Sequence, residues 1–246
     1  MNQTIVSSSS SSAQPVGDGE SVKSRPLMGS RTRYSRLIGA LFLSAFLLYG
    51  VGFALVTSVT GAPDFLATMS AHQTILTIGA VLMLLNSVAV VALGVLFFPI
   101  LERHGKRTAL AYLAARIVEG VFLAGGVLAL LMTVPLAQQG IDAGLAKALG
   151  SLALQSNTMA YQIAEMSLGL ASLFLCALLF RTRLIPRFLA VWGFVGYAIF
   201  LTGAIAEIVG IHIGLVLSIP GGLFELALGF WLLINGFEPK AYGQES

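Results

Sequence analysis

Four ionisable residues stand inside long apolar stretches of this sequence, where charges are costly. They are Arg116, Glu119, Glu165 and Glu225. A charged side chain at the centre of a bilayer costs at least about 2.5–3.5 kcal/mol on insertion scales. Ionisable groups placed there can pair with one another, share a proton or bind an ion or small solute. These four residues are therefore the first candidates for a functional site.

Arg116 and Glu119 are three positions apart, so on a helix they share a face and can form an ion pair. Tyr112 lies one turn earlier on the same face. If the three carboxyls converge on the single guanidinium, they cannot all be ionised cheaply, so we expect one ionised Arg–Glu pair and at least one protonated carboxyl. Polar residues in or beside the same apolar segments complete the predicted ligand-binding set, which is Arg116, Glu119, Glu165, Glu225, Asn86, Tyr112 and Gln162.

The sequence Pro220-Gly221-Gly222 stands just before Glu225. Proline cannot donate a backbone hydrogen bond, and two glycines after it make local unwinding easy. Broken helices at membrane depth often form solute or ion sites in transporters. A break here is therefore possible, but a simple packing kink is the commoner outcome of such a sequence.

Six apolar segments must position these residues. The chain has 246 residues, of which 57% are hydrophobic and 10% are charged, against about 25% charged in soluble domains. The segments span about 37–59, 73–101, 109–136, 157–180, 188–209 and 212–234. Each can cross an apolar core of about 30 Å as a helix, and none alternates polar with apolar residues as a barrel strand would. The predicted fold class is all-α, a polytopic membrane protein with a bundle of six transmembrane helices.

Basic residues predict the orientation of this bundle. Twelve fall on one predicted side: Lys23, Arg25, Arg31, Arg33, Arg36, Arg103, Lys106, Arg107, Arg181, Arg183, Arg187 and Lys240. Only Lys147 falls on the other side, and Arg116 lies within a segment. By the positive-inside rule, both termini are expected in the cytoplasm, and the expected location is the bacterial cytoplasmic membrane.

Outside the six-helix domain, expected over residues 31–238, the sequence predicts little structure. Residues 1–30 include the serine run Ser7 to Ser12 and are expected to form a disordered cytoplasmic tail. Residues 239–246 are expected to form a second, short tail. Between the third and fourth segments, Ile141 to Leu154 is compatible with a short amphipathic helix on the membrane surface.

Several function classes lack support in the sequence. We find no G-x-S-x-G or H-E-x-x-H motif, so an enzyme is not expected. The single Cys176 lies in an apolar run and is expected to be a core residue, and no cofactor or metal is predicted. The basic residues follow topology and predict no nucleic-acid partner. The leading hypothesis is a protein that binds or passes a small solute, ion or proton; the alternative is a scaffold or sensor subunit whose protein partners are unknown.

Three stretches of the chain resemble a known family of bacterial multi-pass membrane proteins, the domain of unknown function 4386 family. They are Ala115-Arg116-Ile117-Val118-Glu119, the run from Arg183 to Gly193, and the run from Glu225 to Phe237. The resemblance covers roughly residues 33–238. It implies a membrane location and gives no reaction, and it adds weight to Arg116, Glu119 and Glu225 as a set.

Overall fold

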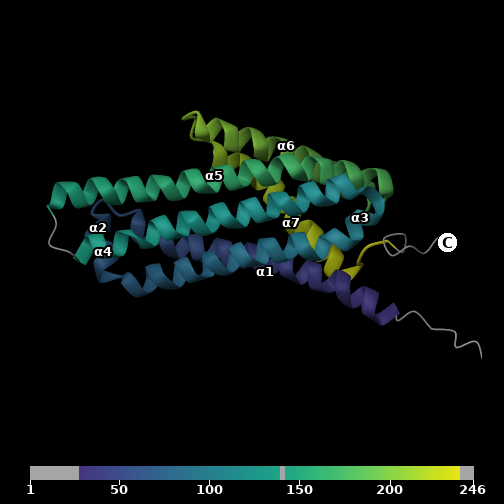
Figure 1. The fold of residues 1–246 in the computed structure, drawn as a ribbon, viewed down its shortest axis with the longest axis horizontal. Helices are drawn as coiled ribbons and strands as arrows, with labels where there is room; N and C mark the ends of the chain where they lie inside the picture. Colours follow the sequence, from purple (N-terminus) through teal and green to yellow (C-terminus); the bar gives the residue numbers. More distant parts are fainter. Residues whose placement is uncertain (1–27, 139–141, 239–246) are drawn as a thin grey trace, which may run out of the picture.

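The computed structural model describes residues 28–138 and 142–238, and every regular element there is a helix. The predicted serine-rich tail, apart from residues 28–30, and the predicted C-terminal tail lie outside the described residues. The helices are α1 (Met28–Thr60), α2 (Phe65–Ala71), α3 (Gln73–Leu131), α4 (Thr133–Gln138), α5 (Ala143–Thr182), α6 (Arg187–Ile208) and α7 (Gly214–Ile234). Figure 1 shows the long helices side by side in one bundle. The all-α prediction is confirmed.

Five of these helices, α1, α3, α5, α6 and α7, are long and apolar enough to cross a membrane. Helix α3 has 59 residues and would be about 90 Å long if straight, roughly three times the apolar core of a bilayer. It is not straight, because the backbone leaves the helical region at Gly105, with φ −175° and ψ 85°. Figure 1 shows α3 doubling back into two antiparallel arms. These arms correspond to the second and third predicted segments.

The long helices form a closed ring in which each packs on two neighbours. Helix α1 packs on α3, α3 on α5, α5 on α6, α6 on α7, and α7 returns to α1. At the contact between α1 and α7 the backbones approach so closely that a Cβ atom on Gly39 would lie 2.6 Å from the Gly229 carbonyl oxygen. Small residues permit this kind of approach between membrane helices. The ring therefore closes by packing between the first and the last helix.

The start of α1 and the end of α7 lie at the same end of the bundle (Figure 1). The backbone N–H of Phe237 donates to the Ser35 hydroxyl at 3.5 Å, and the N–H of Glu238 donates to the Leu184 carbonyl at 3.1 Å. The turn between α5 and α6 therefore lies at this end too. At the opposite end, α2 and α4 pack together, and Phe65 of α2 lies against Gly150 of α5.

The described part of Ile141 to Leu154 does not form the short surface helix that the sequence allowed. Helix α5 runs without interruption from Ala143 to Thr182, and the side chain of Asp142 caps it by accepting from the Leu145 N–H at 3.0 Å. No proline stands between Ala143 and Thr182, and the stretch is rich in alanine and leucine, which favour helix. The helix consequently continues well beyond the length needed to cross a bilayer. Ile141 lies outside the described residues.

The helix is not broken at Pro220, where the sequence left open either a break or the commoner packing kink. Helix α7 continues from Gly214 to Ile234 with Pro220 inside it. The glycine that follows serves close packing instead, because a Cβ atom on Gly221 would lie 3.1 Å from the Phe200 ring of α6. The sequence Pro220-Gly221-Gly222 therefore marks a close contact between α6 and α7 and not an unwound segment.

Candidate functional site

Arg116 lies at the centre of the ring, on the second arm of α3, and is only 1% exposed. Its Nη1 donates to both carboxylate oxygens of Glu119, at 2.9 and 3.2 Å. Its Nε donates to the Tyr112 hydroxyl at 2.9 Å. The guanidinium also lies over the rings of Phe42 and Tyr112, at 5.7 and 5.2 Å from their centroids. The predicted pairing within α3 is thus present, and both the hydroxyl and the ring of Tyr112 contact the guanidinium.

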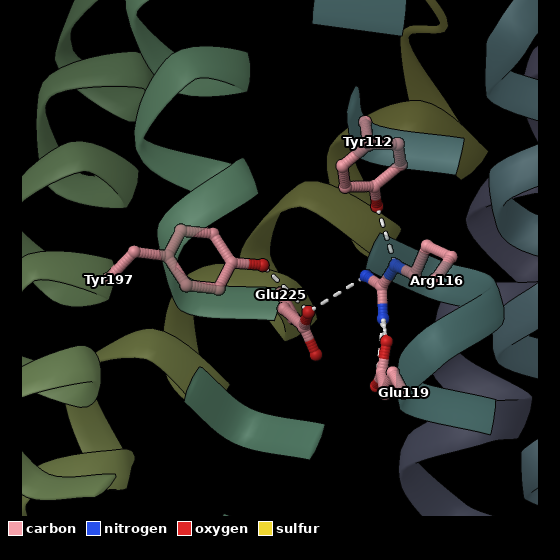
Figure 2. Close-up of polar contacts among 5 residues, drawn as sticks. All are labelled: Tyr112, Arg116, Glu119, Tyr197 and Glu225. Atoms are coloured by element: carbon pink, nitrogen blue, oxygen red, sulfur yellow. Dashed lines mark hydrogen bonds and ion pairs between the residues drawn. The ribbon is translucent and has the colours of Figure 1, made fainter. Parts of the chain in front are cut away.

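A second carboxylate reaches Arg116 from the other end of the sequence. Nη2 of Arg116 donates to Oε1 of Glu225 at 3.1 Å, which connects α3 to α7. The Tyr197 hydroxyl of α6 donates to the same oxygen at 2.7 Å. Figure 2 shows these five side chains meeting, with Glu119 and Glu225 on different sides of the guanidinium. Arg116 and Glu225 together join α3, α6 and α7.

This network borders a cavity of about 260 Å³ enclosed by α1, α3, α5, α6 and α7. Arg116, Glu119 and Glu225 line it, and so do Glu165 of α5 and Asn86 of the first arm of α3. Tyr161, one turn before Glu165, interacts with that carboxyl. The three intramembrane carboxyls therefore face a single space, which is the arrangement expected from the sequence if the helices converge. Dry pairing of Arg116 with Glu119 alone would have left no such space.

The other two predicted residues do not line the cavity. Tyr112 is 1% exposed and lies behind Arg116, among the rings at the end of the bundle where α1 begins. Gln162 is buried on α5 but is absent from the cavity wall. Cys176 is buried in the core, as expected for a small apolar residue. Within the described ranges, no group of three or more His, Cys, Asp and Glu side chains could hold a metal ion.

Sequence reasoning missed Tyr197, whose hydroxyl makes the shortest polar contact of the network. A signal existed, because a phenol in the middle of an apolar segment needs a hydrogen-bond partner when buried. It also missed the contribution of α1, which bears no charge near the site and supplies aromatic side chains instead: Phe42, Phe46, Tyr49 and Phe53. When both the rings and the rest of the helix are apolar, the sequence does not indicate which face of the helix points to the cavity.

A second charged group lies at the tip of the hairpin formed by α6 and α7. Oε1 of Glu207 lies 2.8 Å from Nδ1 of His212, and Oε2 accepts from the Gly214 N–H at 2.9 Å. Glu207 thus caps the first turn of α7 from the end of α6, where the positive end of the helix dipole favours a carboxylate. The His212 side chain is 80% exposed. This arrangement agrees with a structural role for Glu207.

A family model described as a domain of unknown function, DUF4386, matches residues 37–236. The match covers most of the chain. The chain belongs to the DUF4386 family. In this DUF4386 protein, the three charged residues that meet at the site, Arg116, Glu119 and Glu225, all fall inside the matched region. No curated protein and no solved structure matches the chain.

Proposed function

We propose that this DUF4386 protein crosses the bacterial cytoplasmic membrane six times with both termini in the cytoplasm, and that it binds or passes a small cation or proton at the cavity beside Arg116. The role proposed is binding or transport and not a chemical reaction. The supporting observation is that Arg116, Glu119, Glu165 and Glu225, from three different helices, border one cavity.

Six crossings are supported by the two arms of α3, each of which is long enough for one passage. The turn at Gly105 and the turn between α5 and α6 lie at the end of the bundle that also holds the start of α1 and the end of α7 (Figure 1). These turns carry the basic groups Arg103–Arg107 and Arg181–Arg187. Basic residues favour the cytoplasmic side, so this end is assigned there.

The charges around the cavity favour a positive ligand. Three carboxyls face one guanidinium, so the fully ionised set carries an excess of negative charge. Isolated charge in a medium of low dielectric constant is costly, and it is neutralised by protons or by a bound cation. Arg116 neutralises Glu119 most directly, through two contacts from one nitrogen. Glu165, which does not contact Arg116, and Glu225, which contacts it through one oxygen, are available to take the proton or the cation.

The test is ion flux in proteoliposomes that contain the purified full-length protein. An imposed pH gradient, or a Na⁺ or K⁺ gradient, is expected to decay faster than in protein-free vesicles. Glu225→Gln and Glu119→Gln are each expected to reduce this flux or change its pH dependence. Glu207→Gln removes a carboxylate outside the cavity and serves as the matched control.

Thermal unfolding of each variant in detergent separates loss of function from loss of folding. The proposal is wrong if well-folded Glu119→Gln and Glu225→Gln proteins both behave as the wild type does. It is equally wrong if the wild type neither carries nor binds any ion or proton across a range of pH.

A further inference from the structure

Much of the cavity wall is aromatic. Tyr49 and Tyr161 stack with centroids 5.3 Å apart and planes 15° apart. Further rings on the wall are Phe42, Phe46, Phe53 and Phe200. Ring faces attract cations, and an apolar wall also favours an apolar group on the ligand. A bare metal ion would leave this surface unused, whereas an organic cation would contact both the rings and the carboxylates.

Acceptor capacity remains free on the polar side of the cavity. Oε1 of Glu225 accepts from both Arg116 and Tyr197, whereas no described residue donates to Oε2. Figure 2 shows the second carboxylate oxygen of Glu225 turned away from the guanidinium. The Glu225 side chain is 23% exposed despite its depth in the bundle. A ligand bearing N–H donors can therefore reach this carboxylate without displacing Arg116.

Asn86 gives an independent sign of a polar ligand. Its side chain lines the cavity and is only 4% exposed, and no described residue forms a hydrogen bond with its amide. An amide has one acceptor and two donor hydrogens, so this one is available to a polar ligand in the cavity. The amide oxygen can accept from an ammonium N–H inside the cavity.

The cavity is bordered on one side by residues that are also exposed on the outer surface of the bundle. These are Phe46 and Phe53 of α1 and Leu215 of α7, which are 44%, 38% and 67% exposed. Helices α1 and α7 touch closely at Gly39, but at Phe53 and Leu215 the cavity lies between them. Phe46 and Phe53 lie in the apolar part of α1, so this border of the cavity faces the acyl chains of lipid. An amphipathic molecule dissolved in the bilayer would meet it directly.

We propose that the ligand is a protonated organic amine with a small aromatic or branched apolar group, which reaches the cavity from the bilayer between α1 and α7. The ammonium group contacts Glu165, Glu225 and Asn86, and the apolar group packs against the rings of α1 and α5. This inference rests on the proposed function and names the ligand class of that same cavity.

The experiment measures binding of 2-phenylethylammonium to the full-length protein in phosphatidylcholine nanodiscs by equilibrium dialysis, with empty nanodiscs as the blank. Saturable binding is expected, at least about tenfold tighter than that of the neutral analogue 2-phenylethanol, a factor typical of one good charged contact. Glu165→Gln and Glu225→Gln are each expected to weaken amine binding by about tenfold or more and to leave alcohol binding unchanged. Glu207→Gln is expected to bind the amine as the wild type does.

A second variant tests ligand binding without changing the charged network around Arg116. Asn86→Leu leaves every contact of Arg116 in place and removes only the unpartnered amide, so it is expected to fold and to lose affinity for the amine selectively. Equal binding of the amine and the alcohol, insensitive to Glu165→Gln and Asn86→Leu, would overturn the inference by showing simple apolar partitioning.

Failure of this inference is distinguishable from failure of the proposed function. If the amine does not saturate the protein while proton or Na⁺ flux still depends on Glu119 and Glu225, the ligand class is wrong and the proposed function holds. If neither amine binding nor any flux is detected, both are overturned.

Discussion

Two sites in this protein hold a glutamate against donors from another part of the chain, and they differ in almost every other respect. At the central site, Arg116 is 1% exposed and joins α3 to α7, and Tyr197 adds a contact from α6. At the hairpin tip, Glu207 joins α6 to the start of α7 beside a His212 that is 80% exposed. The His212 imidazole at the tip can exchange its partner for water, whereas the Arg116 guanidinium at the centre cannot. Loss of the pairing with a glutamate should therefore cost much more stability at the central site than at the hairpin tip.

The largest expected effect is that of Arg116→Met, which keeps much of the side-chain volume and removes the charge. It leaves Glu119 and Glu225 close together without a cation, and breaking a buried ion pair in this way costs about 3–5 kcal/mol. We expect a large fall in the melting temperature in detergent, and none for His212→Ala. Equal melting temperatures for the two variants would remove the distinction between the sites.

A second change sharpens the cause of that loss. Adding Glu119→Gln to Arg116→Met removes the carboxylate that depends most directly on the arginine. We expect the double variant to be more stable than Arg116→Met alone, with a coupling energy of about 1–3 kcal/mol in a double-mutant cycle of unfolding free energies. Strict additivity would indicate that Arg116 stabilises the bundle by its packing and not by its charge.

Tyr197→Phe tests the contact that the sequence did not reveal. The substitution removes one hydrogen bond to a carboxylate and preserves the ring, so the expected loss of stability is about 1.5–3 kcal/mol. Tyr161→Phe, also at the cavity, lacks a link to Arg116 and provides the comparison in the same unfolding assay. A loss confined to Tyr161→Phe would contradict the role given to Tyr197.

The smallest expected effect is at the tip, and it should depend on salt. Glu207→Gln weakens an exposed pairing, which mobile ions screen as the Debye length falls from about 14 Å at 0.05 M salt to about 4 Å at 0.5 M. Any difference in melting temperature between this variant and the wild type should shrink over that range. The deficit of Arg116→Met should change less over the same range, because Arg116 is only 1% exposed. Parallel salt dependence at both sites would show that the central site is wetter than its burial indicates.

The sequence was most informative at positions where a residue type is energetically unfavourable in its surroundings. Charges within apolar segments are so unfavourable that their positions alone identify Arg116, Glu119, Glu165 and Glu225 as candidates, and all four border the cavity. The pairing of Arg116 with Glu119 followed from helix periodicity alone. The link from Arg116 to Glu225 spans 109 positions, so only the packing of α3 against α7 could establish it.

The features that the sequence left open or did not reveal also have physical causes. Pro220 and its glycines permit either unwinding or close packing, and the neighbouring helix α6, with Phe200 against Gly221, decided between them. The length of α5 was underestimated because hydropathy marks the part of a helix that lies in lipid and not the part that continues beyond it. The aromatic wall supplied by α1 could not be predicted, since rings facing lipid and rings facing a cavity look the same in sequence.

The pairing of Arg116 with Glu119 on one helix bears on how the protein is made. In the proposed topology, helices enter the membrane in the order in which the ribosome delivers them, so the second arm of α3 would be inserted before α6 and α7 are synthesised. At that moment Tyr197 and Glu225 do not yet exist, and Arg116 has only partners from its own helix, Glu119 and Tyr112. These two neighbours let the arginine enter the bilayer as part of a nearly neutral unit. When α7 then packs against the bundle, Nη2 of Arg116 is still free to donate to Glu225. This hydrogen bond helps to select the position at which α7 packs.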